Sequence, residues 1–330
     1  MPPQYQKPTF PVIYSDMFVV AVVSNTPRFR RRYELFEKFK AQLITAQMDF
    51  VVVELAFGDR PFAVTHANEP FSLQLRTHEE FWHKENLINL GIAHGRKLWP
   101  NKKRVGWIDA DCEPVGRTFR EWFEETWHEL QHYEFVQMWE YLQPLDYHYG
   151  PLGSSNPSFM SNYIKFGTPY PVAEKGYPTQ WGSPGLAWAA NFGPHGLDGI
   201  GGLPDVAVLG AGDWYLAHAL ITDLPFRDMN GYTPEYRGYW QRLQDRCEKW
   251  VKRDVGYVRG LFAHFFHGKI VNRGYNTREN ILITGKFNPL TDLKRDHQGL
   301  WQLETHEPRQ IWMRDKIRLY FRARSEDEIS

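Results

Sequence analysis

Cysteine is scarce in this sequence, and long apolar runs are missing. Only 2 of the 330 residues are cysteine, which excludes a fold held together by a framework of disulfides. No stretch is apolar for long enough to cross a bilayer, and no secretory signal is visible at the N-terminus. We therefore expect a cytoplasmic protein without a membrane anchor.

The sequence also has no net charge. The 39 Lys and Arg residues balance the 39 Asp and Glu residues, so no overall field draws the protein to nucleic acid or to an anionic membrane. The local basic runs at 28–32 and 314–324 are more often solvated faces than grooves for a polyanion. Aromatic residues are abundant, with 13 Trp and 17 Tyr. Exposed aromatic rings stack on sugars and bases, which favours a carbohydrate or nucleotide ligand.

The first part of the chain alternates between strand and helix patterns. Apolar β-branched segments at 17–23 and 49–55 flank a segment at 29–46 whose apolar residues recur at helical spacing. A second helical pattern at 79–98 precedes a short strand at 105–108. This alternation predicts a mostly parallel sheet that binds its ligand at the carboxyl ends of the strands.

The remainder is less regular. Residues 144–185 are rich in Pro, Gly, Ser, Asn and Tyr, the composition of a long loop. Other predicted elements are helices at 118–131, 212–221 and 234–252, strands at 134–139 and 255–266, and an ordered segment at 185–190. The last sixty or so residues show few periodic signals, so we expect them to wrap around the domain.

Two aspartates follow the strand at 105–108. In an extended chain Asp109 and Asp111 point to the same side, so both can reach one cation. Mg²⁺ and Mn²⁺ bind carboxylates together with phosphate oxygens and water. The pair therefore predicts a metal site facing a diphosphate such as that of a nucleotide sugar. Asp-x-Asp also occurs in solvated loops, so this interpretation depends on the motifs that follow.

Lys84 lies on the apolar face of the helix predicted at 79–98. A buried ammonium group is costly without a partner. The sequence leaves two partners open: a carboxylate inside the fold, or a ligand phosphate or acid of a carbohydrate site.

A glycine-rich segment at 201–212 presents Asp213 at the start of a helix. Glycines allow close backbone approach, and an Asp in this position acts either as a helix cap or as a general base. The sequence leaves both roles open.

His264 and His267 follow the strand predicted at 255–266, and either could supply a third metal ligand. A zinc site is less favoured, because no Cys or Glu lies nearby at zinc-like spacing. Arg273 and Arg278 offer planar guanidinium groups to phosphate or, alternatively, to surface carboxylates.

Taken in order, these motifs resemble a nucleotide-sugar-dependent glycosyltransferase of the A-type fold, similar to small cytosolic transferases of phages and bacteria. The segments that carry the resemblance are Val22-Val23-Ser24-Asn25 with Arg28 and Tyr33, Trp82 to Asn89, Trp107 to Asp111, Gly210 to Trp214, and His267-Gly268 with Arg273-x-Tyr275.

The resemblance implies an α/β fold whose mostly parallel, Rossmann-like sheet continues into a mixed half on the acceptor side. It implies a lead-in at 1–16, a single catalytic domain at 17–295 and a C-terminal extension at 296–330 packed on that domain. Within the domain, 17–115 would bind the nucleotide and 116–295 the acceptor.

The resemblance also implies roles for individual residues. Mn²⁺ or Mg²⁺ would be held by Asp109, Asp111 and His267, and Asp213 would act as the base. The donor-binding set is Ser24, Asn25, Arg28, Lys84, Asn89, Asp109, Arg273 and Tyr275, and the acceptor-side set is Asp205, Trp188 and Trp214. Gly-Ala-Gly-Asp-Trp has one acid where many inverting relatives have two, which leaves inversion or retention open.

The activity implied is transfer of a hexosyl or pentosyl group from a nucleoside-diphosphate sugar, with a UDP-sugar favoured, to an acceptor hydroxyl. The acceptor is open between a hydroxymethylated pyrimidine in phage DNA, a polysaccharide precursor and a protein. For DNA, the run at 28–32 and the aromatic-rich loop at 139–181 would contact phosphates and a displaced base, although zero net charge counts against it. A non-catalytic nucleotide-sugar-binding module and a metal-dependent hydrolase are the alternatives from other classes.

Overall fold

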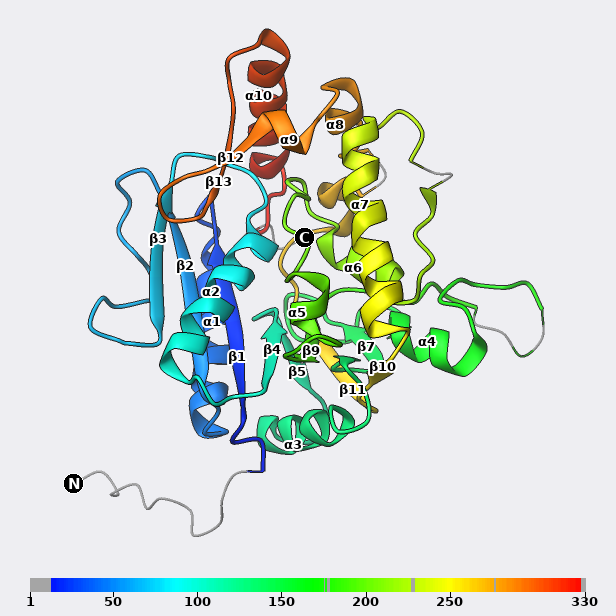
Figure 1. Ribbon diagram of the computed structural model, residues 1–330. Helices are drawn as coiled ribbons and strands as arrows, with labels where there is room; N and C mark the ends of the chain where they lie inside the picture. The colour runs from blue at the N-terminus through cyan, green and yellow to red at the C-terminus, as the bar shows by residue number, and fades with distance from the viewer. Residues whose placement is uncertain (1–12, 175, 177–178, 227–228, 276, 328–330) are drawn as a thin grey trace.

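The computed structural model describes residues 13–174, 176, 179–226, 229–275 and 277–327 (Figure 1). Most of the predicted lead-in and the last three residues of the predicted C-terminal extension lie outside these ranges. A seven-stranded sheet forms the centre. Its strands, in spatial order, are β10 (Val255–Tyr257), β6 (Phe135–Gln137), β9 (Ala187–Asn191), β4 (Arg104–Ile108), β1 (Met17–Ser24), β2 (Phe50–Phe57) and β3 (Ser72–Thr77).

The sheet is parallel except at one strand. β9 runs antiparallel to both of its neighbours, β4 and β6, and the remaining pairs are parallel. The order β3-β2-β1-β4 is that of a Rossmann-like half, in which ligands bind beyond the carboxyl ends of the strands where the order reverses. The prediction of an α/β fold with a mostly parallel sheet is confirmed.

Helices cover both faces of β1 and β2, which explains their unbroken apolar sequences. Phe18, Val20, Val51 and Val53 point to the face covered by α2 (Lys84–Leu98) and share its hydrophobic cluster. The alternate residues of the same strands pack with Phe36 and Phe39 of α1 (Arg30–Thr45) and with α3 (Phe119–Glu129) on the other face. These two layers fix where β1 and β4 end.

The close packing of α2 on the sheet depends on a small residue at Gly91. A Cβ there would lie 2.6 Å from a methyl of Val20 and 2.7 Å from a methyl of Val53. We expect Gly91→Ala to lower the free energy of unfolding by about 1–3 kcal/mol, because the core is overpacked. Urea denaturation measures this change.

Gly238 in α7 (Pro234–Arg246) is the matched control, because a Cβ there would meet only the flexible end of Arg242. Gly238→Ala should raise the free energy of unfolding by up to about 1 kcal/mol through helix propensity. Equal gains in the two variants would contradict the packing argument.

A second, four-stranded sheet brings distant residues to the end of β4. It contains β5 (Cys112–Pro114), β11 (Leu261–His264), β7 (Tyr141–Pro144) and β8 (Asn156–Pro157). His264 pairs with Cys112 across antiparallel strands, and the backbone N–H of Phe265 donates to the carbonyl of Asp111 at 2.8 Å. Sheet register therefore places two histidines beside Asp111.

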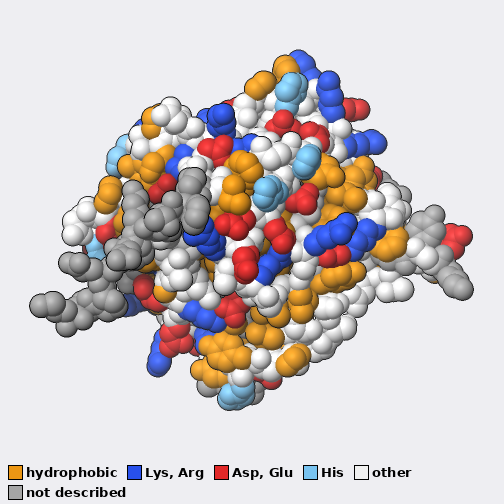
Figure 2. Space-filling view, turned by 90° about the horizontal axis from the view of Figure 1, so that it is seen from below, with side chains coloured by type: hydrophobic (Ala, Val, Ile, Leu, Met, Phe, Trp, Pro, Cys, Tyr) orange, Lys and Arg blue, Asp and Glu red, His pale blue; other side chains and the backbone are white. Residues whose placement is uncertain are grey.

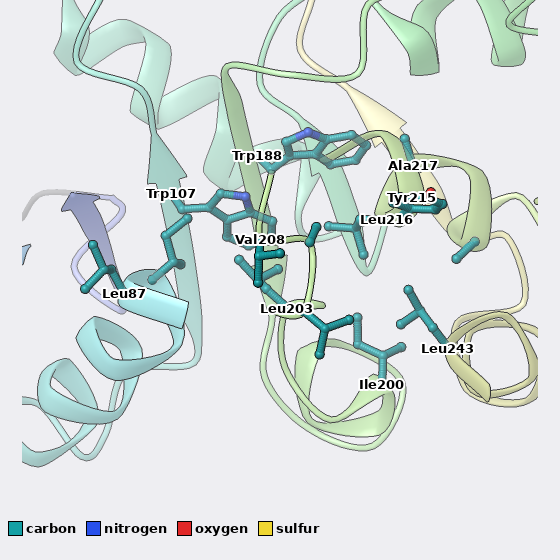
Figure 3. Close-up of a cluster of buried hydrophobic side chains, with 14 of the residues drawn as sticks. Leu87, Trp107, Trp188, Ile200, Leu203, Val208, Tyr215, Leu216, Ala217 and Leu243 are labelled. Carbon is teal, nitrogen blue, oxygen red and sulfur yellow. The ribbon is translucent and has the colours of Figure 1, made fainter. Parts of the chain in front are cut away.

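The helices of the second half pack on the same face of the sheet as α2. These are α5 (Leu197–Ile200), α6 (Gly212–Leu220), α7 and the π-helix at Cys247–Val251. Figure 3 shows Leu216 of α6 and Leu243 of α7 in the buried cluster that also contains Trp107 of β4. This cluster fixes the start of α6 relative to the end of β4.

Several predicted elements differ from those observed. The loop predicted at 144–185 contains the helix α4 (Phe159–Phe166). Ser158 is the N-cap of this helix, and its side chain accepts the backbone N–H of Ser161. The strand predicted at 255–266 is two strands, β10 and β11, in different sheets. Strand β3 was not predicted, because half-exposed side chains alternate weakly there.

The C-terminal part continues across the surface as short elements and one long helix. They are a 3-10 helix (Ile270–Arg273), α8 (Asn280–Thr284), α9 (Pro289–Asp292), the hairpin of β12 (Leu293–Arg295) and β13 (Trp301–Leu303), and α10 (Pro308–Arg322). Helix α10 buries Met313, Ile317 and Phe321 in the main core. The division at 295/296 falls in the β12–β13 turn and stays a prediction. None of the described helices is long and apolar enough to span a membrane.

Candidate functional site

A cavity of about 690 Å³ lies beyond the carboxyl ends of β1 and β4. This volume is within the range of small-molecule sites. Both predicted halves of the domain contribute to its wall, as does Arg324, which follows α10. The predicted residues that line it are Ser24, Lys84, Asp109, Asp111, Asp213, Trp214, His267, Arg273 and Tyr275.

Asp111, His264 and His267 form a cluster with the geometry of a metal site. The Nε2 atom of His267 lies 2.9 Å from Oδ2 of Asp111 and 3.2 Å from Nε2 of His264. One ligand atom from each residue lies within 4.8 Å of the others. Metal–ligand bonds of roughly 2.1 Å place neighbouring ligand atoms about 3 Å apart, so the cluster fits a single cation.

The electrostatics of the cluster also suit a cation. Burial opposes the charged form of Asp111, but the charge of His267 and hydrogen bonds from both histidines hold its pKa well below the usual value. Burial lowers the pKa of His264, so its imidazole is neutral near pH 7. The buried Oδ1 of Asp111 has no hydrogen-bond partner among the described residues. A carboxylate, a neutral imidazole and an unsatisfied oxygen are a fitting ligand set for Mn²⁺.

Asp109 has a different partner. Strand β4 ends at Ile108, and the residues after it form a turn instead of an extended strand. The Nζ of Lys84 lies 2.5 Å from Oδ1 and 2.8 Å from Oδ2 of Asp109. Lys84 points inward as predicted. The sequence left open whether its partner is a carboxylate of the protein or a ligand group, and in the structure the partner is the carboxylate of Asp109. Asp109 lies outside the three-residue cluster, and its role as a metal ligand stays a prediction.

Asp213 also lines the cavity and lies in the first turn of α6. The N-cap position is taken by Ala211, whose φ is 72° and which makes no side-chain cap. Oδ1 of Asp213 accepts the backbone N–H of Trp214 at 2.8 Å. Asp213 is therefore an acid at the cavity wall and is not the cap residue of α6.

Sequence reasoning missed several acids and bases of the cavity. Glu85, next to Lys84, is 6% exposed, and burial raises its pKa to about 8. Glu279 accepts a hydrogen bond from the hydroxyl of Tyr232 at 3.0 Å, and burial raises its pKa as well. The sequence offered one signal for Glu85: it follows Lys84, which was predicted to point inward, in the same helical turn. No local pattern joins residues 232 and 279.

A tail segment, residues 324–327, follows α10, and its first residue, Arg324, lines the cavity. Glu326 is 2% exposed and accepts a hydrogen bond from Nη2 of Arg32 at 2.7 Å. One of its oxygens lies 3.7 Å from Nδ1 of His267. Asp327 accepts the backbone N–H groups of Arg30 and Arg31 at 2.8 and 2.9 Å. The tail segment thus contacts both the N-terminus of α1 and a candidate metal ligand.

The other predicted residues do not line the cavity. Their roles stay predictions, and their contacts lie within the protein. The side chains of Asn25 and Asn89 hydrogen-bond the backbones of Phe29 and Leu203, respectively. Asp205 pairs with Arg295 at 2.6 Å, and the indole N–H of the buried Trp188 donates to the carbonyl of Pro184 at 2.7 Å. Arg28 has a backbone φ of 62°.

No protein-family model matches the chain, and no curated protein matches it in sequence. Three solved structures are similar over most of its length. The catalytic domain of Drosophila beta1,4galactosyltransferase 7 is 11% identical, with coverage of 90% of this chain and 98% of that one and a TM-score of 0.36. Glucosyl-3-phosphoglycerate synthase from Mycobacterium tuberculosis is 12% identical, with coverage of 92% and 94% and a TM-score of 0.36. TarS from S. aureus is 11% identical, with coverage of 93% and 89% and a TM-score of 0.34.

Proposed function

We propose that this protein is a metal-dependent glycosyltransferase that moves a sugar from a nucleoside-diphosphate sugar to an acceptor hydroxyl. One observation carries the proposal: the cluster of Asp111, His264 and His267 and the carboxylate of Asp213 line one cavity at the carboxyl ends of a Rossmann-like sheet. A cation site and a carboxylate base in one cavity are what transfer from a diphosphate requires.

The donor side would bind the diphosphate. Asp111, His264 and His267 would hold Mn²⁺ or Mg²⁺, and the bound cation offsets the negative charge of the leaving diphosphate. Nη2 of Arg273 lies 2.9 Å from Nε2 of His267, and its buried Nε has no partner among the described residues. A guanidinium group beside the cation site suits a phosphate oxygen.

Asp213 would act on the acceptor. Its carboxylate takes the proton of the acceptor hydroxyl while that oxygen forms a bond to the anomeric carbon. The bond between the anomeric carbon and the diphosphate oxygen breaks, and the electron pair leaves with the diphosphate. Lys84, paired with Asp109, supplies a fixed positive charge on the same wall of the cavity.

Donor binding can be measured before any acceptor is known. We expect a sugar nucleotide, with UDP-sugars tested before GDP-, ADP- and CDP-sugars, to raise the melting temperature only when Mn²⁺ is present. A ligand at 100 times its Kd stabilises the native state by about 2.7 kcal/mol. A thermal-shift panel with Mn²⁺ or with chelator measures this. The proposal is wrong if no sugar nucleotide gives a Mn²⁺-dependent shift.

Duplex DNA is a less supported acceptor. In the basic run at 28–32, Arg30 pairs with Glu34 at 2.6 Å and Arg32 with Glu326. Figure 2 shows positive and negative side chains interspersed over one face, without a broad basic surface. A phosphate backbone needs a basic groove to release its counterions. We therefore infer a small hydroxyl acceptor that enters the cavity.

A further inference from the structure

Glu85 is a buried acid that makes no hydrogen bond to another described residue. It is the second residue of α2, is 6% exposed and lines the cavity. The neighbouring Lys84 pairs with Asp109. The charge of Lys84 and the backbone N–H of Glu85 itself act on the carboxyl group of Glu85. Because no other residue hydrogen-bonds this carboxyl group, it can bind a ligand in the cavity.

The packing of Glu85 places its carboxyl group against the start of α6. A Cβ added at Gly212 would lie 2.5 Å from Cδ and 2.6 Å from Oε1 of Glu85. Asp213, the next residue, lines the same cavity. A second void of about 10 Å³, also lined by both residues, has room for about one water. Because Glu85 and Asp213 both line the larger cavity, one ligand there can contact both.

The ionisation of Glu85 suits a hydroxyl. Burial raises its pKa to about 8, Lys84 opposes that change and Asp213 adds to it. At neutral pH the group is mainly a carboxylic acid, which both donates and accepts a hydrogen bond. A hydroxyl group does the same, whereas an anionic group would be repelled by Asp213.

We propose that Glu85 is an acceptor-binding residue, whose carboxyl group hydrogen-bonds a second hydroxyl of the acceptor while Asp213 takes the proton of the hydroxyl that reacts. This inference rests on the proposed function and narrows its acceptor to a polyhydroxylated molecule, the carbohydrate class. A hydroxymethylated pyrimidine base or a serine side chain has only one hydroxyl to offer.

The test compares Glu85→Ala and Glu85→Gln with the wild type. The acceptor probes are p-nitrophenyl glycosides of xylose, glucose and galactose, and an oligonucleotide containing 5-hydroxymethylcytosine. We expect transfer to a glycoside, and Glu85→Ala should raise the KM for that glycoside roughly 10- to 50-fold, because a hydrogen bond is lost. Glu85→Gln should recover part of this loss. The Mn²⁺-dependent thermal shift with donor alone reports whether each variant still binds the donor.

Deoxy analogues of the accepted glycoside identify the bonded hydroxyl. Removal of that hydroxyl should raise the acceptor KM of the wild type by the same factor as Glu85→Ala, and the two losses should not add.

Glu121→Gln is the matched control: it also replaces a first-turn acid, but in the capping box of α3 and outside the cavity lining. Glu121→Gln should leave the KM for the acceptor unchanged.

Three results would overturn the inference: an unchanged acceptor KM in Glu85→Ala, additive losses for every deoxy analogue, or transfer to none of the glycosides. Failure of the proposed function is distinct, because then the wild type would show no Mn²⁺-dependent shift with any sugar nucleotide.

Discussion

Asp111→Asn is expected to lower kcat/KM for the sugar donor by a factor of about 10³ or more. The amide has nearly the same shape but no charge, so the cation loses its anionic ligand between His264 and His267. A factor of 10³ corresponds to about 4 kcal/mol of transition-state stabilisation, the several kcal/mol that a metal ion supplies at a leaving group.

Two measurements separate this loss from unfolding. Isothermal titration with Mn²⁺ alone should show weaker binding to Asp111→Asn, and urea denaturation measures how much stability the lost charge removes. The fold keeps its local bond, because the carbonyl of Asp111, and not its carboxylate, accepts from Phe265. Asp315→Asn, at an acid that is 55% exposed on α10, is the control. Full activity of chelator-treated Asp111→Asn would exclude a metal role for the cluster.

Asp213→Asn is expected to lower the rate of transfer by about 10²- to 10⁴-fold, the usual contribution of a general base. The asparagine keeps an oxygen to accept the N–H of Trp214 but cannot take a proton. Donor binding should survive, because Asp213 does not belong to the cluster of Asp111, His264 and His267. Acceptor-dependent release of nucleoside diphosphate measures the rate, and the thermal shift with Mn²⁺ and donor measures binding.

The two variants should therefore separate the two halves of the reaction. Asp111→Asn should lose the donor shift, and Asp213→Asn should keep it. If Asp213→Asn transfers sugar at the wild-type rate, another group is the base, and Glu85 is a further acid that lines the cavity. Donor hydrolysis that exceeds transfer in the wild type with every acceptor would favour a hydrolase instead.

Local patterns were sufficient for the sheet and part of the site. Strands β1, β2 and β4 are short, mostly apolar runs with polar residues at or just after their ends, so their carboxyl ends could be located from the sequence. Lys84 points inward from α2, as its position on the apolar face of the helix predicted. The Asp-x-Asp argument assumed an extended chain, but β4 ends at Ile108 and the carboxylates diverge to Lys84 and to the histidines.

What the sequence could not supply depends on tertiary contacts. His264 joins the cluster because β11 pairs with β5, more than a hundred residues away along the chain. Glu85 faces the start of α6 only because both helices pack on one sheet face. The contact between Glu326 and His267 likewise joins segments that no periodicity relates.

The contact of Glu326 with His267 has a thermodynamic consequence. The tail segment and a cation would share one imidazole, through Nδ1 on one side and Nε2 on the other. If a bound cation strengthens the binding of the tail segment to the rest of the protein by some factor, the bound tail segment must strengthen cation binding by the same factor. This holds because the coupling free energy between the two binding events is a single quantity. Substitutions at 324–327 would then alter metal affinity without replacing any of the ligands.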